Sequence, residues 1–380
     1  MRILPSLMVR NEETMRFDRR LISHFDWTLL LLTLALLSIG VMAVYSATYE
    51  AGQHLSPWTI RQLSWAALGL LGMVVTFAVD YRRLERWAYP LYGFSLVLLL
   101  LVPVLGSFGG GARRWINLGL FSLQPSELVK VTLLLVLARY FQRYAPPQGY
   151  RLRDLVYPVV LVAIPAGLVL AEPNLGTAVI LGFLFLSLAF AAGIRLGSLV
   201  LAGIAGGSVL PLLWHHLKPY QKQRVSSFLN PDLDPLGAGY HMIQSKITVG
   251  SGMLWGKGFL QGTQNRLDFL PEKHTDFVFA VLAEEWGFVG TLVLLTLYCA
   301  LLARLLVIAW KARDRFGSFL AVGVVGMAFW QLLINIGMNI GVLPVVGVPL
   351  PLLSYGGSSL LTMLVALGLA LNVSTRRFLF

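Results

Sequence analysis

The run FVFAVLAEEWGFVGTLVLLTLYCALLARLLVIAW (277–310) decides the fold class. It is apolar enough to cross a membrane, but it is longer than a single membrane-spanning helix. As one helix it would reach about 50 Å, whereas the hydrocarbon core of a bilayer is about 30 Å thick. We therefore expect a short first helix, holding Glu284, Glu285, Gly287 and Gly290 and packed inside protein, before the span itself. Polar backbone at membrane depth is tolerated where it is buried or lines a watery cavity, which implies a cavity near Asp276.

The composition of the whole chain is that of a membrane protein with many spans. Hydrophobic residues make up 57% of its 380 residues and charged residues 13%, whereas soluble domains are about 25% charged. A helix needs about 20 largely apolar residues to cross the hydrocarbon core. Suitable windows lie at 27–46, 63–79, 88–106, 125–143, 155–171, 177–193, 198–215, 288–310, 318–338 and 357–374. The predicted fold class is an all-α polytopic membrane protein with about ten transmembrane helices.

Basic residues predict how the chain is oriented, because cytoplasmic loops are rich in Lys and Arg. They cluster before the first window and after every second one, at Arg2, Arg10, Arg16, Arg19, Arg20, Arg82, Arg83, Arg86, Arg139, Arg143, Arg151, Arg153, Arg195, Arg304, Lys311, Arg313, Arg315, Arg376 and Arg377. Both termini are therefore expected in the cytoplasm, with a large extracytoplasmic loop (216–275) between spans 7 and 8. The net charge of +12 mostly records this topology, so nucleic-acid binding is a poor explanation of it.

Three domains are predicted from these boundaries. They are a cytoplasmic N-terminal tail (1–26), a ten-span membrane domain (27–375) and a short cytoplasmic C-terminus (376–380).

The strongest candidate for chemistry is Asp276, which lies where the long polar loop enters a helix. An Asp at such a place is often an N-cap that accepts hydrogen bonds from free backbone N–H groups, and this alternative carries equal weight. Titratable neighbours favour chemistry: Glu272, Lys273 and His274 precede Asp276, and Glu284 lies roughly 80° round the helix from it. The spacing of these groups matches no standard metal-ligand pattern.

Two motifs on other outer-face segments add charged groups. In GGGARRW (109–115), Arg114 suits phosphate oxygens, while Trp115 is equally suited to interfacial anchoring. In QPSELVK (124–130), Glu127 and Lys130 lie about one turn apart on a helix. They form either an internal ion pair between helices or part of a polar cavity wall, since ionisable groups in a membrane usually mark a functional path.

The long loop carries many Lys and Arg residues, although the extracytoplasmic side is expected to be poor in them. These are Lys218, Lys222, Arg224, Lys246, Lys257, Arg266 and Lys273. Long loops are partly exempt from the charge rule, but an anionic lipid headgroup or a diphosphate is the sharper explanation.

A proline-rich segment near the C-terminus cannot be a plain helix. PVVGVPLP (344–351) and SYGGSS (354–359) contain too many prolines for continuous helical hydrogen bonding. We expect a structured re-entrant loop that either touches the substrate or closes the bundle.

These motifs together resemble the SEDS family (shape, elongation, division and sporulation), and within it the elongation, RodA-type branch. The resemblance covers nearly the whole chain and rests on GARRWINLG, QPSELVKV, EPNLGT, DPLGAGYHMIQSKITVGSG, GKGFLQGTQNRLDFLPEKHTDFVFAVLAEE and GVLPVVGVPLPLLSYGGSS. It implies an inner-membrane peptidoglycan glycosyltransferase that polymerises lipid II at the periplasmic face. It also implies that Asp276 is essential and that Trp115, Glu127 and Lys130 matter. The partners it implies are a class B penicillin-binding protein and the elongation machinery.

The resulting hypothesis is an inverting transfer in which Asp276 accepts the proton of the acceptor hydroxyl. Arg114, Lys130, Lys246 or a divalent cation (Mg²⁺ or Mn²⁺) would stabilise the leaving diphosphate. The residues expected to bind substrate are Glu127, Lys130, Arg114, Trp115, Lys246, His274, Glu284 and Arg224. The competing hypotheses are a lipid II flippase, for which a polar cavity between helices would also be expected, and a non-catalytic scaffold for a penicillin-binding protein.

Overall fold

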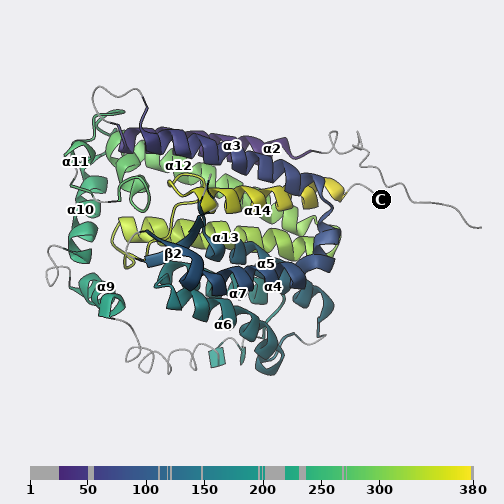
Figure 1. Cartoon of the computed structure of the whole chain (residues 1–380). Coiled ribbons are helices and arrows are strands. Elements are labelled where there is room, and N and C mark those ends of the chain that lie inside the picture. The colour runs from purple at the N-terminus through teal and green to yellow at the C-terminus, as the bar shows by residue number, and fades with distance from the viewer. Residues whose placement is uncertain are drawn as a thin grey trace, which may run out of the picture.

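The fold is a bundle of long helices with loops and short helices gathered at one end (Figure 1). The computed structural model describes residues 25–49, 55–109, 112–117, 119, 122–146, 149–195, 197–198, 200–201, 219–230, 237–267, 269–270 and 272–377. The window predicted as a span at 198–215 lies almost entirely outside these residues, as does Lys218.

The long helices confirm a polytopic helical membrane protein. Seven described segments are long and apolar enough to cross a membrane: α2 (Trp27–Ala47), α3 (Pro57–Ala78), α4 (Tyr81–Leu105), η1 with α6 (Leu152–Leu155 and Val156–Ala171), α12 (Val278–Trp310), α13 (Arg315–Asn339) and α14 (Gly357–Arg376). Two shorter or more polar helices, α5 (Pro125–Arg143) and α7 (Leu175–Ala191), complete the bundle. The count of ten spans and their orientation stay predictions.

The centre of the bundle is formed by α5, α13 and α14, whose residues are mostly buried. The close contact of α14 with α3 depends on Gly368, where an added Cβ would lie 2.1 Å from Thr76 Oγ1 and 2.6 Å from the Met73 carbonyl oxygen. Small residues let membrane helices approach closely, which gains van der Waals contact where no hydrophobic effect drives association.

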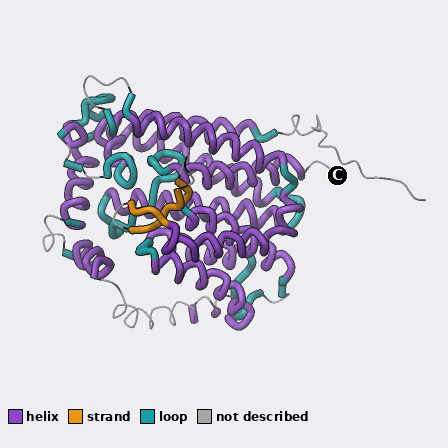
Figure 2. Tube along the Cα trace, viewed as in Figure 1, coloured by secondary structure: helices purple, strands orange, loops and turns teal. Residues whose placement is uncertain are grey.

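A small sheet at one end departs from the predicted all-α class. β1 (Gly106–Gly109), β2 (Ala112–Asn117) and β3 (Ser122–Leu123) pair antiparallel in that order, as Figure 2 shows. Ser107 pairs with Trp115, and the register shifts between Ser107 and Phe108. Arg114 and Trp115, which the sequence analysis placed on an outer-face segment, therefore lie on a paired strand.

The same end of the bundle holds three short helices, α9 (Pro219–Leu229), α10 (Ala238–Ser251) and α11 (Thr263–Arg266). In Figure 1, α10 lies across the end of the bundle, close to the start of α12.

The expected break in 277–310 is present at Gly287, whose backbone has φ 67° and ψ −164°. The part of α12 before the break is buried, including both Glu284 and Glu285. The loop after α10 covers the backbone groups that the break leaves open: Lys257 N–H donates to the Glu284 carbonyl at 3.0 Å, and Phe288 N–H donates to the Met253 carbonyl at 2.8 Å. The prediction of a short helix packed inside protein is confirmed, but its extent was wrong, because the break at Gly287 places Gly290 in the long helix that follows.

At the opposite end of the bundle, Asp26 joins three helices. Its carboxylate accepts from Arg304 Nε of α12 at 3.0 Å, from Ser374 Oγ of α14 at 3.1 Å and from Leu29 N–H of α2 at 3.1 Å. Asp26 is almost completely buried, so these contacts satisfy a carboxylate that has little access to water.

Candidate active site

Asp276 lies in the turn immediately before α12 and is partly exposed. The N-cap of α12 is Phe277, whose side chain makes no capping hydrogen bond. Of the two alternatives for Asp276, the N-cap position is therefore wrong, because Asp276 precedes it by one residue.

The backbone of Asp276 is fixed from α13 by two buried amides. Asn335 Nδ2 and Asn339 Nδ2 each donate to the Asp276 carbonyl oxygen at 3.0 Å. Asn335 Nδ2 also donates to the Val348 carbonyl at 2.8 Å. Sequence reasoning missed both residues, although Gln331, Asn335 and Asn339 recur every four residues on one face of an otherwise apolar helix, a pattern that marks inward-facing polar groups.

The proline-rich segment is non-helical, as expected, and lies against Asp276. An added Cβ at Gly347, whose φ is 71°, would lie 3.5 Å from Asp276 Oδ2. Gly176, in the first turn of α7, approaches the same segment so closely that an added Cβ would lie 2.6 Å from the Val346 carbonyl. The bend at Gly347 therefore forms one wall beside the carboxylate.

His274 lies in the same turn as Asp276 and packs against two aromatic rings at tilted angles. Its ring centroid is 4.7 Å from that of Trp58 and 5.6 Å from that of Tyr355. Its carbonyl accepts from Tyr355 N–H at 2.9 Å. Burial lowers the pKa of His274; Glu272 opposes this shift and Lys273 adds to it. The imidazole is therefore neutral at pH 7, where it can donate or accept a hydrogen bond without adding charge.

Lys246 was one of the cations expected to stabilise the diphosphate. In the structure it lies on a helix that contacts α13, the helix whose amides hold Asp276. Its helix, α10, is tied to the end of α13 by a hydrogen bond from Ser245 Oγ to the Asn339 carbonyl at 2.9 Å. Its side chain lies against Gly341, where an added Cβ would be 1.7 Å from Lys246 Cε. Lys246 is exposed, so its ammonium group is available to an anionic ligand.

Glu127 and Lys130 form a buried ion pair at the start of α5. Lys130 Nζ lies 2.7 Å from Glu127 Oε2, and both side chains are almost fully buried. This end of α5 is held by Gln124 N–H, which donates to Ser358 Oγ at 3.0 Å. The structure shows an internal ion pair, but it lies within α5 and does not join two helices as the first alternative expected. The second alternative, a place in a polar cavity wall, stays a prediction. A contact with substrate stays a prediction.

Arg114 is held by backbone carbonyls, and Trp115 follows it on β2. Arg114 Nε donates to the Glu172 carbonyl at 3.1 Å, and Arg114 Nη2 donates to the Pro173 carbonyl. These bonds tie the sheet to the turn between α6 and α7. Burial raises the pKa of the Glu172 carboxyl to about 7, although Arg114 acts in the opposite direction.

Glu284 belongs to a different network from Asp276. Its carboxylate is fully buried, lies 2.6 Å from Lys257 Nζ and accepts from the N–H groups of Gln264 and Asn265 at 3.0 and 3.3 Å. It is also about 12 Å from Asp276 along the helix axis. These contacts favour a structural role over the expected substrate contact. The side chain of Arg224 lies outside the described part of the chain.

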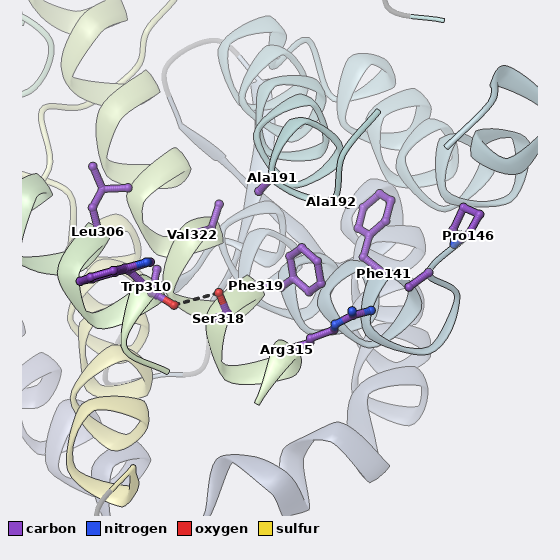
Figure 3. Close-up of a pocket in the computed structure, with 12 residues that line it drawn as sticks. Phe141, Pro146, Ala191, Ala192, Leu306, Trp310, Arg315, Ser318, Phe319 and Val322 are labelled. Atoms are coloured by element: carbon purple, nitrogen blue, oxygen red, sulfur yellow. Dashed lines mark hydrogen bonds between the residues drawn. The ribbon is translucent and has the colours of Figure 1, made fainter. Parts of the chain in front are cut away.

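A cavity of about 640 Å³ lies at the far end of α12 from Asp276 (Figure 3). Trp310, Arg315 and Phe319 contribute to its lining. It is not the cavity that the sequence predicts near Asp276, which stays a prediction. Within the described ranges, no three or more His, Cys, Asp or Glu side chains are grouped so that they could hold a metal ion.

The chain is similar to known proteins over most of its length. Residues 27–378 match the family of FtsW, RodA and SpoVE, described as a cell cycle protein family. The chain is 44% identical over 355 residues to the peptidoglycan glycosyltransferase MrdB of Escherichia coli K12, covering 93% of this chain and 94% of that protein. It is 33% identical over 429 residues to the peptidoglycan glycosyltransferase RodA of Treponema pallidum, covering 94% and 99%.

Solved structures show the same fold. A structure on the coordination of polymerization and crosslinking by a peptidoglycan synthase complex aligns with a TM-score of 0.79 at 38% identity, covering 93% of this chain and 98% of that chain. The rod shape determining protein RodA of Thermus thermophilus aligns with a TM-score of 0.70 at 34% identity, with the same coverage.

Proposed function

The chain belongs to the FtsW, RodA and SpoVE family and is a peptidoglycan glycosyltransferase of cell wall synthesis, and from this premise we propose that it polymerises lipid II with Asp276 as its catalytic base. The observation that carries the proposal is the carboxylate itself. Asp276 is partly exposed, precedes the N-cap of α12, and is held through its backbone by two amides of α13 beside the bend at Gly347.

The proposed step transfers a sugar from the diphosphate-linked donor to an acceptor hydroxyl, with inversion at the anomeric carbon. Asp276 accepts the hydroxyl proton as the new glycosidic bond forms, and the bond from the anomeric carbon to the diphosphate breaks. The diphosphate leaves with the electron pair and needs cations more than a proton. Lys246 suits this role, because it is exposed, whereas Lys130 is buried against Glu127 and Arg114 donates to two carbonyls.

We further propose that the membrane domain spans 27–375 with ten helices, that both termini are cytoplasmic, and that Asp276 faces the periplasm from the inner membrane. The positive residues at one set of loops support this orientation. A class B penicillin-binding protein is the proposed partner, supported by the similarity to a chain of a complex that coordinates polymerization with crosslinking. The cellular process would be elongation and the maintenance of rod shape.

Polymerisation of fluorescent lipid II by the purified full-length chain tests the proposal, with products separated on a gel. Because detergent solution has no second compartment, polymer formed there distinguishes a polymerase from a flippase. Asp276→Asn is expected to abolish polymer, and Lys246→Met to reduce it strongly. Glu272→Gln, which removes an exposed carboxylate four residues away, is the matched control and is expected to remain active.

A normal rate with Asp276→Asn would exclude this residue as the base. Size-exclusion profiles of each variant show whether the protein remains folded. A chelator arm, followed by Mg²⁺ or Mn²⁺, tests the proposed divalent ion, which would be held by one carboxylate and by the phosphates of the substrate, as Mg²⁺ often is.

A further inference from the structure

A tight turn after α10 carries three consecutive large apolar side chains that face away from the protein. Met253, Leu254 and Trp255 are 80%, 61% and 79% exposed. A contiguous exposed apolar patch marks a contact with a partner or with a membrane.

The turn is rigidly held, so this exposure does not come from a loose loop. Phe288 N–H donates to the Met253 carbonyl at 2.8 Å, and Val289 N–H donates to the Leu254 carbonyl at 3.1 Å. Both ends of the turn touch the chain of α12. An added Cβ at Gly252 would lie 1.9 Å from the Ala283 carbonyl, and one at Gly256 would lie 2.1 Å from the Glu285 carbonyl.

These hydrogen bonds place the turn at the level of Phe288, where the membrane-spanning part of α12 begins. From Phe288 to Trp310 this helix is about 33 Å long, close to the thickness of the hydrocarbon core. Trp310, at the other end, is 84% exposed. Tryptophans at both boundaries of a span are typical of the aromatic belts of membrane proteins, and Trp255 provides the second one.

The apolar surface of the turn continues an apolar face of α12. Phe288, Val289, Leu292 and Val293 are all exposed on this membrane-spanning helix. An exposed face of this kind on a membrane span contacts lipid. Because the turn is bonded to the first residues of that face, its side chains reach the same lipid phase at its edge.

We propose that Met253, Leu254 and Trp255 form an interfacial anchor, which inserts into the headgroup–acyl boundary of the leaflet nearest Asp276 and fixes the depth of α10. Because Lys246 lies on α10, the anchor would also fix the depth of the cation proposed to stabilise the diphosphate. Only this consequence rests on the proposed function, and the insertion into lipid does not. Met253 has a φ of 49°, a backbone conformation that glycine adopts with less strain. A methionine at a position that favours glycine supports a role for its side chain.

Spin labelling of the full-length chain in phosphatidylethanolamine–phosphatidylglycerol nanodiscs tests the anchor. In a Cys299→Ala background, a nitroxide is attached at Leu254→Cys, and its collision rates with oxygen, which concentrates in lipid, and with a water-soluble nickel chelate are measured. Leu292→Cys on the lipid face and Arg313→Cys beyond the opposite end of α12 are the references. We expect several-fold lower access of the nickel chelate at 254 than at 313, and oxygen access approaching that at 292.

Equal access of the nickel chelate at 254 and 313 would overturn the anchor. Protection that appears only after a second membrane protein is added would also overturn it, in favour of a protein-docking surface. Neither outcome depends on polymerisation, so failure of the anchor and failure of Asp276 as the base are distinguishable.

A second label at Ile247→Cys, on the exposed side of α10, tests whether the anchor fixes depth. Combining Leu254→Ser with Trp255→Ser is expected to raise nickel access at 247 several-fold. Leu267→Ser, an exposed apolar residue elsewhere on the loop, is the control, and Trp255→Tyr should retain the original value. Unchanged access at 247 in the double variant would overturn the depth-fixing role. If that variant does not fold, Met253→Gly replaces it, because glycine relieves the backbone strain at this position. Nickel access at 247 is again expected to rise.

Discussion

At the scale of single residues, the site depends on which charged groups are already occupied by protein. Glu284 and Lys257 neutralise each other, as do Glu127 and Lys130. At Asp276, the amides of α13 hold the backbone carbonyl and so position the residue. Sequence reasoning could single out Asp276 as a candidate from its place before a helix. It could not assign Glu284, because the loop segment that encloses that carboxylate is distant in sequence.

Replacing Asn339 tests whether the amides position the base. Asn339→Ala removes a donor to the Asp276 carbonyl, and loss of such a buried hydrogen bond costs about 1–3 kcal/mol. We expect kcat for lipid II polymerisation to fall, with a smaller change in KM, because the amide holds the base and does not bind the donor lipid.

The control is Gln331→Ala, which removes a buried amide two turns earlier on the same face of α13. An equal loss of kcat in both variants, or a loss explained by a lower Tm, would show that Asn339 serves stability only.

Glu172 gives the folded protein a pH dependence of known sign. The pKa of its carboxyl is raised to about 7 by burial, so the folded state binds a proton that the unfolded state releases at lower pH. Stability attributable to Glu172 is therefore present below its unfolded pKa and is lost as pH rises to about 7.

Glu172→Gln removes this loss, which is on the order of 3 kcal/mol. Thermal unfolding in detergent should give a higher Tm than the wild type at pH 8 and a similar Tm at pH 4.5. A lower Tm for the variant at pH 8 would mean that the ionised carboxylate is stabilising.

At the scale of elements, the break in α12 was predictable and the small sheet was not. The length of 277–310 was sufficient to predict two helices, whereas the place of the break was not predicted, because Gly287 and Gly290 were both assigned to the first helix. The strands at 106–123 are short, and Gly109 and Gly110 interrupt any alternation of side chains, so their pairing depends on neighbours in space. The site shows the same contrast: the non-helical proline segment was expected, but its contact with Asp276 was not.

Gly287→Ala should destabilise the protein strongly. A side chain is strained at φ 67°, and the added Cβ would lie 2.2 Å from the backbone nitrogen of Gly256. We expect a loss of roughly 1–3 kcal/mol from the backbone alone, measured as a lower Tm in detergent.

Gly167→Ala is a matched control within a helix, since an added Cβ there meets no atom within 4 Å. If both variants had the wild-type Tm, the close packing of α12 against the loop after α10 would be refuted.

At the scale of the whole molecule, the two ends of the bundle differ: one holds the candidate site, and the other holds an ion-pair cluster that joins three helices. One end gathers the sheet, α10, the proline segment and Asp276. The other joins helices from the beginning, the late middle and the end of the described chain through Asp26, Arg304 and Ser374. This organisation follows from the alternation of apolar windows with charged loops, whereas the identity of each buried ion pair required the three-dimensional packing.

Asp26→Asn should weaken the whole bundle without touching the candidate site. Removing one partner of a buried ion pair costs about 3–5 kcal/mol, and we expect the lower part of that range because Arg304 is partly exposed. The measurement is Tm in detergent, with polymerisation per folded molecule expected to stay close to the wild type.

Asp80→Asn is the comparison variant, since the Asp80 carboxylate, which pairs with Arg376, is more open to water than that of Asp26, and pairs near the surface contribute about 0–1 kcal/mol. Equal losses of Tm in the two variants would contradict a dominant role for the Asp26 cluster.

The break at Gly287 also has a mechanical consequence. A lateral force on the long membrane-spanning part of α12, such as bending of the bilayer or traction by a bound neighbour, reaches a point where the helical ladder stops. The torque is taken up by the loop bonded there, while the segment beyond it remains attached to α13 through Asn335 and Asn339. We therefore expect Asp276, the proposed base, to keep its position when the membrane-spanning part of α12 bends.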